Sequence, residues 1–239
     1  MKAFIFAAGL GTRLHPLTLS KPKALVEADG RTLIERCICS LKAAGINDFI
    51  INVHHFADQI EDYLAEHNNF DCNILISDER KQLLDTGGAV AAARDLLGNE
   101  TFLIHNVDIV SNLNLNSFLS KGLQGAAARL VVSQRQTSRY LLIDKDSKLC
   151  GWTNVKTGEI RGPALNMHPS DYYKAAFSGI HIFGPQLFPY MDKWPSCFSI
   201  IDFYLSVCDI FPIEAEFCPE LIIKDLGTPQ AIASFSDFQ

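Results

Sequence analysis

The sequence lacks the features that would place it in several other classes of protein. No apolar run approaches the ~20 residues that a membrane-spanning helix needs. Met1 and Lys2 lead directly into an apolar strand, so we expect no targeting segment. The net charge of −6 offers no basic surface to nucleic acid. We therefore expect a cytoplasmic protein that binds neither membranes nor nucleic acids, and we leave open whether it forms a homo-oligomer.

Cysteine pairs with metal-binding or redox spacing are also absent. The seven cysteines include no Cys-x-x-Cys pair. Because their number is also odd, we expect neither a disulfide framework nor a zinc site. We predict reduced, buried thiols, with Cys37 and Cys39 on a helix as the clearest case.

The sequence does contain an alternation of strand-like and helix-like segments through its first hundred residues. This alternation is typical of a parallel sheet covered by helices on both faces. With 239 residues and 48% hydrophobic content, the chain is expected to form one α/β domain. Strands are expected at 2–8, 48–53, 73–77 and 101–105, and helices at 32–45, 57–66 and 86–97.

Beyond residue 125 the pattern changes. Strand-like runs at 126–133, 140–143 and 175–183 are separated by irregular segments. No low-complexity linker divides them from the first part of the chain. We interpret these runs as additional strands of the same domain.

The most informative stretch is FAAGLGTRLHPLTLSKPKAL, at residues 6–25. An apolar strand runs into Gly9 and Gly11, which allow a positive φ and bring backbone N–H groups close to an anion. Arg13 and Lys23 then supply positive charge. This layout is typical of a phosphate-binding site.

Two better-known glycine loops do not match this stretch. A dinucleotide-binding fingerprint requires a third glycine where this chain has Leu14. A P-loop requires Gly-Lys followed by Ser or Thr, which is absent. Pro16 and Pro22 disfavour a continuous helix. We therefore expect a long irregular loop that wraps over a nucleotide.

A glycine pair enters an alanine-rich helix in the segment LDTGGA, at residues 84–89. Small residues at Gly87 and Gly88 would let a flat base lie against the backbone. The alternative interpretation is an ordinary helix N-terminus with Thr86 as its cap.

Two aspartates follow separate strands. Asp108 lies just past a buried strand, at the edge of the sheet where ligands of open α/β folds bind. Asp225 follows a strand at 221–223 and precedes a helix that Thr228 and Pro229 are suited to begin. Two such carboxylates would suit a Mg²⁺ ion shared with triphosphate oxygens. The alternative for Asp108 is that it only caps a turn.

The motif G-x-G-T-R-L-x-P-L-T at 9–18, followed by K-P-K at 21–23, resembles the signature of the sugar-1-phosphate nucleotidylyltransferases, or nucleoside-diphosphate-sugar pyrophosphorylases. Weaker similarities continue to about residue 231. The resemblance implies a Rossmann-like, mixed and mostly parallel sheet flanked by helices in a single domain. Residues 1–125 would be its nucleotide-binding half, and residues 126–239 a sugar-binding lobe that carries the second metal aspartate. The implied reaction transfers a nucleoside monophosphate from an NTP to a sugar 1-phosphate and releases pyrophosphate.

The resemblance also implies roles for individual residues. In catalysis, Lys23 would hold the α-phosphate and the incoming phosphate, Arg13 would hold the β- and γ-phosphates, and Asp108 with Asp225 would hold Mg²⁺. The residues implied to bind the nucleotide are Ala8, Gly9, Leu10, Gly11, Thr12, Arg13, Gly87 and Gly88. Ser178 and Gly179 resemble a turn that contacts the sugar. The family usually has Gly-Asp where this chain has Val107-Asp108.

The acceptor and the base are open points. Many family members carry a Glu-Lys-Pro segment whose lysine holds the sugar phosphate. No such segment occurs at 149–161, where Trp152, Asn154 and Lys156 lie instead. This absence and the Thr-Gly-Gly sequence look most like the N-acetylmuramate-1-phosphate uridylyltransferase branch, so UTP is the favoured donor. Mannose- or heptose-1-phosphate guanylyltransferases and phosphocholine cytidylyltransferases are the alternatives.

Two different classes of protein must also be considered. A metal-dependent glycosyltransferase would show Asp-x-Asp at the strand end, but residues 108–110 read Asp-Ile-Val. A nucleotide-sugar-binding module without catalysis is expected to have lost a charged residue of the site. Arg13, Lys23 and both aspartates are present, which favours an enzyme.

Overall fold

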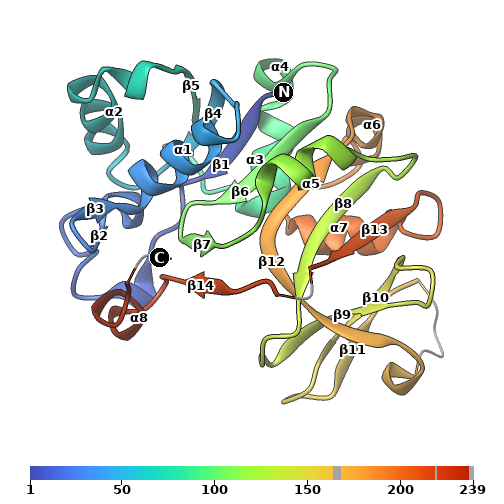
Figure 1. The fold of residues 1–239 in the computed structure, drawn as a ribbon. Coiled ribbons are helices and arrows are strands. Elements are labelled where there is room, and N and C mark those ends of the chain that lie inside the picture. Colours follow the sequence, from blue (N-terminus) through green and yellow to red (C-terminus); the bar gives the residue numbers. More distant parts are fainter. Residues whose placement is uncertain (164–167, 219, 237–239) are drawn as a thin grey trace.

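One large mixed sheet organises the chain (Figure 1). The structure, a computed structural model, describes residues 1–163, 168–218 and 220–236. The strands of the sheet run in the order β11-β10-β9-β12-β6-β1-β4-β5, and β8 pairs with β12 and β13 beside this path. These strands are β1 (Ala3–Phe6), β4 (Asp48–Val53), β5 (Asn73–Asp78), β6 (Phe102–Asn106), β8 (Ala128–Ser133), β9 (Arg139–Ile143), β10 (Leu149–Asn154), β11 (Glu159–Arg161), β12 (Tyr173–Phe183) and β13 (Ile213–Phe217).

The remaining elements are helices and two short ribbons. The ribbons pair β2 (Glu27–Ala28) with β3 (Arg31–Thr32), and β7 (Ile109–Ser111) with β14 (Ile223–Asp225). The helices are α1 (Leu33–Ala43), α2 (Ala57–Glu66), α3 (Asp85–Ala92), α4 (Arg94–Leu97), α5 (Leu115–Lys121), α6 (Phe188–Met191), α7 (Ile200–Val207) and α8 (Pro229–Ala233). In the part of the chain described, no helix has the length and apolar character needed to cross a membrane.

The alternation of side chains along β1 shows how the sheet divides two hydrophobic cores. Ala3 and Ile5 join a core that includes residues of α1, α2 and α5. Phe4 and Phe6 point to the opposite core, which is formed with α3, α4, α6 and α7. Successive residues of a strand point to opposite faces, so helices cover both faces of the sheet. The prediction of a mixed α/β sheet flanked by helices in a single domain is confirmed.

The two halves of the sheet differ in direction. β1 lies between β4 and β6 and is parallel to both, and β4 is parallel to β5. The long strand β12 is antiparallel to β6, β8 and β9. β12 therefore joins the parallel half of the sheet to the strands that follow residue 125 (Figure 1).

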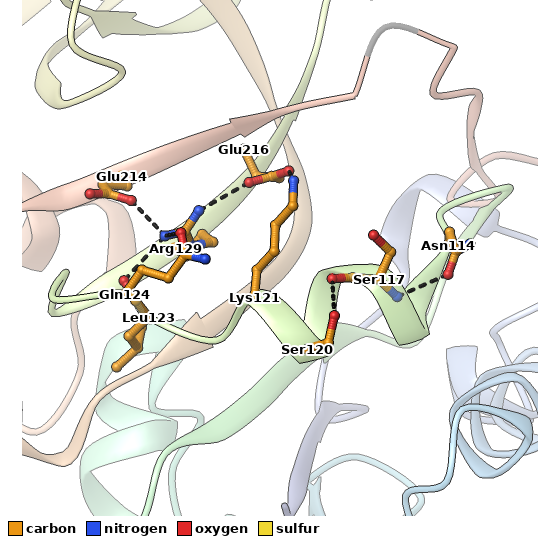
Figure 2. Close-up of polar contacts among 9 residues, drawn as sticks. All are labelled: Asn114, Ser117, Ser120, Lys121, Leu123, Gln124, Arg129, Glu214 and Glu216. Carbon is orange, nitrogen blue, oxygen red and sulfur yellow. Dashed lines mark hydrogen bonds and ion pairs between the residues drawn. The ribbon is translucent and has the colours of Figure 1, made fainter.

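A partly buried ion-pair network joins β8 to β13 (Figure 2). Arg129 of β8 contacts Glu214 at 2.7 Å and Glu216 at 3.1 Å. Lys121, at the end of α5, also pairs with Glu216. Both carboxylates belong to β13, so this network fixes β13 and α5 against β8.

Most predicted elements are present, with changes at their ends. The strand at 48–53 and the helix at 57–66 have the predicted bounds. The helix predicted at 86–97 begins at Asp85 and is divided at Ala93, where φ is −83° and ψ is 5°. Gly98 ends it with a φ of 78°, as predicted.

The cysteine prediction is partly wrong. All seven cysteines are free thiols, as expected. Cys37, however, is the fully buried one, whereas Cys197 is exposed and the others, including Cys39, are half-buried. Cys39 and Cys37 are two positions apart on α1, and residues at that spacing do not share one face of a helix.

Candidate active site

The loop that follows β1 is tied to two neighbouring strands by buried polar groups. The backbone N–H groups of Ala7 and Ala8 donate to Oδ1 of Asn52, at 2.7 and 3.3 Å. Nδ2 of Asn52 donates to Oε1 of Glu79 at 2.7 Å, and Oε2 of Glu79 accepts from the backbone N–H of Leu84 at 3.1 Å. Burial of Glu79 raises the pKa of its carboxyl group. Sequence reasoning missed Asn52 and Glu79, although a polar residue inside the apolar run FIINV was a signal.

The glycines of the loop have different conformations. Gly11 adopts the predicted positive φ of 65°. A Cβ atom at Gly11 would lie 2.9 Å from Cβ of Lys23 and 3.0 Å from Cγ2 of Thr18, so this glycine lets the segment that carries Lys23 approach. The prediction of a positive φ at Gly9 is wrong, since the φ angle of Gly9 is not positive. A Cβ at Gly9 would meet no atom within 4 Å, so the space beside it is free.

Four charged side chains from distant parts of the sequence converge at the carboxyl end of β6. Lys23 Nζ forms an ion pair with Oδ2 of Asp108. Nη2 of Arg13 lies 3.9 Å from Oδ2 of Asp108 and 3.7 Å from Oδ1 of Asp225. The side chain of Asp108 is 8% exposed, whereas that of Arg13 is 60% exposed. We call these residues, Arg13, Lys23, Asp108 and Asp225, the charged cluster.

The β7–β14 ribbon brings the two aspartates together. Asp225 is paired in register with Ile109, the residue after Asp108. The backbone N–H of Leu226 donates to the carbonyl oxygen of Asp108 at 2.8 Å. At Gly227, a Cβ atom would lie 2.4 Å from Nη2 of Arg13. A side chain at this position would therefore displace Arg13 from between the carboxylates.

The two carboxylates of the charged cluster are oxygen donors of the kind that magnesium binds. One nitrogen of Arg13 lies within 4 Å of oxygens from both aspartates, so the two carboxylates face the same guanidinium group. In the described residues no group of three or more His, Cys, Asp or Glu side chains is arranged to hold a metal by itself. Magnesium commonly takes one or two protein carboxylates and completes its shell with water and phosphate oxygens.

A cavity of about 410 Å³ opens beside the cluster, and we call it the Gly9 cavity. It reaches from Lys23 and Asp108 at one end to the first residues of α3, Asp85 and Thr86. Its lining is Phe6, Ala8, Gly9, Lys23, Asn52, Glu79, Leu83, Asp85, Thr86, Asn106, Val107, Asp108 and Cys197. The structure thus brings Ala8, Gly9, Lys23 and Asp108 to one cavity.

A second cavity, of about 620 Å³, lies on the other side of the cluster, and we call it the arginine cavity. Arg13 and Asp225 belong to its wall, together with Arg135, Arg139 and Arg161. The other lining residues are Thr137, Ser138, Leu141, Trp152, Phe177, Ser199 and Ile201. The charged cluster therefore lies between two cavities.

Comparison with known proteins assigns the family. The chain matches the family described as nucleotidyl transferase over residues 2–161, which is more than half of its length. The chain belongs to this family. The match contains the loop after β1, Asp108 and most of the arginine cavity wall.

Relatives of this nucleotidyl transferase include sugar-phosphate enzymes. This chain is 44% identical to N-acetylmuramate alpha-1-phosphate uridylyltransferase of Caulobacter vibrioides over 110 residues. The matched segment covers 45% of this chain and 46% of that protein. This chain is 41% identical to mannose-1-phosphate guanyltransferase of Neurospora crassa over 112 residues, and this segment covers 46% of this chain and 30% of that protein. The matched segment thus spans less than half the length of these curated relatives.

Solved structures share the fold of the whole chain. HddC from Yersinia pseudotuberculosis, complexed with GMP-PN, has a TM-score of 0.76 at 22% identity and covers 97% of this chain and 96% of its own. The inositol-1-phosphate CTP transferase from T. maritima has a TM-score of 0.75 at 16% identity and covers 96% of this chain and 90% of its own. At these identities the likeness concerns the fold alone.

The structure gives the glycine pair of this nucleotidyl transferase a packing role. Gly87 and Gly88 are not among the residues that line the Gly9 cavity, and the nucleobase contact that the resemblance implied stays a prediction. Both N–H groups donate to the carbonyl oxygen of Phe198, at 2.8 and 3.2 Å. A Cβ at Gly87 would lie 2.4 Å from the Phe198 ring, and one at Gly88 would lie 2.1 Å from the carbonyl oxygen of Ser196. The pair therefore lets α3 contact the segment at 196–198.

Thr86 is not the N-cap of α3, which was the alternative interpretation. It lies within the helix, and its Oγ1 accepts from the backbone N–H of Ile200 at 2.9 Å. The first turn of α3 is thereby fixed to the start of α7. Thr86 and Asp85 lie at the Gly9 cavity in place of the two glycines.

The two residues of the predicted sugar-contacting turn line neither cavity, but residues beside them do. Ser178 is 1% exposed and lines neither cavity. Gly179 has a φ of 74°, and a Cβ there would lie 2.6 Å from Nδ2 of Asn106. This glycine brings β12 against the end of β6, so that Asn106 lines the Gly9 cavity and Phe177 the arginine cavity.

Proposed function

We propose that this nucleotidyl transferase moves a nucleoside monophosphate from an NTP to a sugar 1-phosphate, releasing pyrophosphate and forming a nucleoside-diphosphate sugar. The observation that carries the proposal is the charged cluster between two cavities. The Gly9 cavity would hold the nucleotide, with residues 1–125 providing almost all of its wall. The arginine cavity, formed mostly by residues 126–239, would hold the acceptor. The names of the curated relatives support a sugar phosphate as acceptor.

The charges of the cluster define what each residue does. A sugar phosphate is already an anionic nucleophile, so the site needs no general base to activate it; it must align the two phosphates and offset their charge. Lys23 is held beside Asp108 and would contact the α-phosphate and the incoming phosphate. Arg13 is more exposed and would contact the β- and γ-phosphates.

Asp108 and Asp225 would hold Mg²⁺, which, when bound, neutralises charge on phosphate oxygens. The N–H of Gly227 donates to Oδ1 of Asp225 at 2.9 Å and keeps that carboxylate oriented toward Arg13. Leu10, Gly11 and Thr12 belong to the loop that would close over the phosphates. Gly11 acts there by admitting Lys23, as its contact distances indicate.

UTP is the donor that we propose, on the similarity to the uridylyltransferase. One observation favours GTP as a second candidate. The carboxylates of Glu79 and Asp85 both line the Gly9 cavity, and an ionised carboxylate only accepts hydrogen bonds. Guanine presents N–H donors at N1 and N2, whereas uracil presents one donor, at N3. Part of this acceptor capacity is already used, because Glu79 accepts from Asn52 and Leu84.

The test is pyrophosphate release by the purified protein with Mg²⁺. UTP, GTP, CTP and dTTP are each combined with N-acetylmuramate 1-phosphate and with mannose 1-phosphate, and kcat/KM is compared. We expect the largest value for UTP with N-acetylmuramate 1-phosphate. A larger value for GTP would reverse the base assignment and leave the reaction class standing. Transfer of sugar from a nucleotide sugar, without pyrophosphate release from any NTP, would refute the reaction class.

A further inference from the structure

The arginine cavity contains more positive charge than the charged cluster explains. Three arginines beyond Arg13 line it: Arg135, Arg139 and Arg161. Arg135 lies between β8 and β9, Arg139 is the first residue of β9, and Arg161 ends β11. Arg135 and Arg139 lie four residues apart where the chain enters β9, whereas Arg161 comes from β11, and all three line one cavity.

Arg161 differs from the other two, because its charge is already paired. Its Nη1 contacts Asp202 and its Nε lies 3.2 Å from Oε1 of Glu159. Its guanidinium carbon lies 3.8 Å from the centre of the Trp152 ring. Arg161 therefore has a structural role in the wall of the cavity, where it stacks on one face of the Trp152 ring.

Arg135 and Arg139 have no carboxylate within ion-pair distance in residues 1–163, 168–218 and 220–236. Nη2 of Arg135 donates to the carbonyl oxygen of Phe177 at 3.2 Å. The segment between the two arginines is itself fixed. The N–H of Thr137 donates to the hydroxyl oxygen of Tyr140 at 3.0 Å, and the carbonyl of Ser138 accepts from the N–H of Val155 at 2.8 Å.

The charged cluster by itself does not offset the charge of the substrates. Its two cationic residues, Arg13 and Lys23, are matched by two anionic residues, Asp108 and Asp225. A triphosphate with one Mg²⁺ and a sugar phosphate both remain negatively charged. Bringing them together therefore requires cations outside the cluster. The two unpaired arginines lie in the cavity that shares Arg13 and Asp225 with the cluster.

We infer that Arg135 and Arg139 bind the phosphate of the acceptor, in place of the lysine of the missing Glu-Lys-Pro segment. This inference rests on the proposed function. Guanidinium groups suit the role because they donate paired hydrogen bonds to phosphate oxygens. Asn154 and Lys156, considered above for this role, do not line the cavity, and Trp152 is covered by Arg161.

The experiment compares Arg135→Gln, Arg139→Gln and Arg139→Lys with the control Arg94→Gln. Arg94 is an arginine of α4 that pairs with Asp192 at 3.2 Å and lines neither cavity. Two quantities are measured for each protein. The first is KM for the NTP and for the acceptor in the pyrophosphate-release assay. The second is the Kd of N-acetylmuramate 1-phosphate and of mannose 1-phosphate by calorimetry, with Mg²⁺ and a non-hydrolysable NTP analogue present.

We expect each glutamine variant to raise acceptor KM and Kd by about 10- to 100-fold, the size of a lost charge-assisted hydrogen bond. The KM of the NTP should change less than about twofold, Arg139→Lys should recover part of the loss, and Arg94→Gln should match the wild type. Equal losses with both sugar phosphates would locate the contact at the phosphate. A loss confined to N-acetylmuramate 1-phosphate would overturn the inference in favour of the sugar's carboxylate.

Two further results separate this inference from the proposed function. If the wild type turns over and the variants change only the KM of the NTP, the arginines bind the triphosphate and the inference is wrong while the function stands. If no substrate pair releases pyrophosphate but Kd for sugar phosphates still depends on both arginines, the function fails and the anion site remains. Unchanged Kd in both glutamine variants overturns the inference in either case.

Discussion

Substituting Gly88 by alanine separates the packing role of the glycine pair from a contact with the base. A Cβ at this position would lie 2.1 Å from the carbonyl oxygen of Ser196 and 3.1 Å from Cβ of Leu84. Ordinary contacts of a Cβ atom begin at about 3.4 Å, so the backbone at Ser196 must move by more than about 1 Å. The obstacle is a backbone atom, which cannot rotate away as a flexible side chain can.

Overpacking of this kind costs about 1–3 kcal/mol, and a clash with backbone belongs at the upper end. For a domain of this size 1 kcal/mol shifts Tm by about 2–4 °C, so we expect Gly88→Ala to lower Tm by about 6 °C or more. The measurement is thermal unfolding followed by circular dichroism, without nucleotide.

The matched control is Gly9→Ala, because a Cβ at Gly9 would meet no atom within 4 Å. This variant should keep the Tm of the wild type within about 2 °C. Its methyl group would enter the Gly9 cavity, so it should raise the KM of the NTP. If Gly88→Ala keeps its Tm and only raises the KM of the NTP, the glycine contacts the base and the packing argument is refuted.

The other predictions concern the charged cluster and the buried carboxyl group of Glu79. Lys23→Ala should lower kcat by about 100-fold or more with its circular dichroism spectrum unchanged, because in the proposed reaction Lys23 would stabilise charge on the phosphate being transferred; an effect limited to KM would remove it from catalysis. Activity should require Mg²⁺ or Mn²⁺, and Asp108→Asn and Asp225→Asn should each be severely impaired but not additive, since both would serve one ion; a rate unaffected by EDTA would contradict this. Burial raises the pKa of Glu79 in the folded protein above its unfolded value of about 4.5. The protonated side chain therefore stabilises the fold below pH 4.5, and this contribution to stability is lost as the pH rises through the folded-state pKa. The Tm of Glu79→Gln relative to wild type should therefore increase from pH 4.5 to 7, and a constant difference would show that Glu79 does not titrate in this way.

The sequence predicted best those elements whose pattern is local. The strand at 48–53 is a short apolar run and the helix at 57–66 has a clear apolar period, and the structure reproduces the bounds of both. The cap at Thr228 is also confirmed, because its Oγ1 accepts from the N–H of Ala231 at 3.2 Å. Capping depends on residues within one turn, which the sequence displays directly.

Long-range partners could not be predicted in the same way. The three-residue strands β7 and β14 are too short to show a period, yet their pairing brings the aspartates together. The partner of Gly87 and Gly88 is the segment at 196–198, more than a hundred residues away. The glycines therefore indicated correctly that another segment approaches the helix closely, but the sequence did not show which segment. Arg135 and Arg139 were missed because charged residues beside a strand are usually solvated.

The β7–β14 ribbon also bears on when the proposed site is completed as the chain is made. A nascent chain carries Arg13, Lys23 and Asp108 once the first 108 residues exist, but Asp225 reaches Asp108 only after strand β14 has been synthesised and has paired with β7. Until then Arg13 lacks one of its two anionic neighbours, and the pair of carboxylates proposed to hold Mg²⁺ is incomplete. Under the proposed function, catalysis would therefore be among the last properties that the molecule acquires, and enzymatic activity would report that β14 has docked against β7.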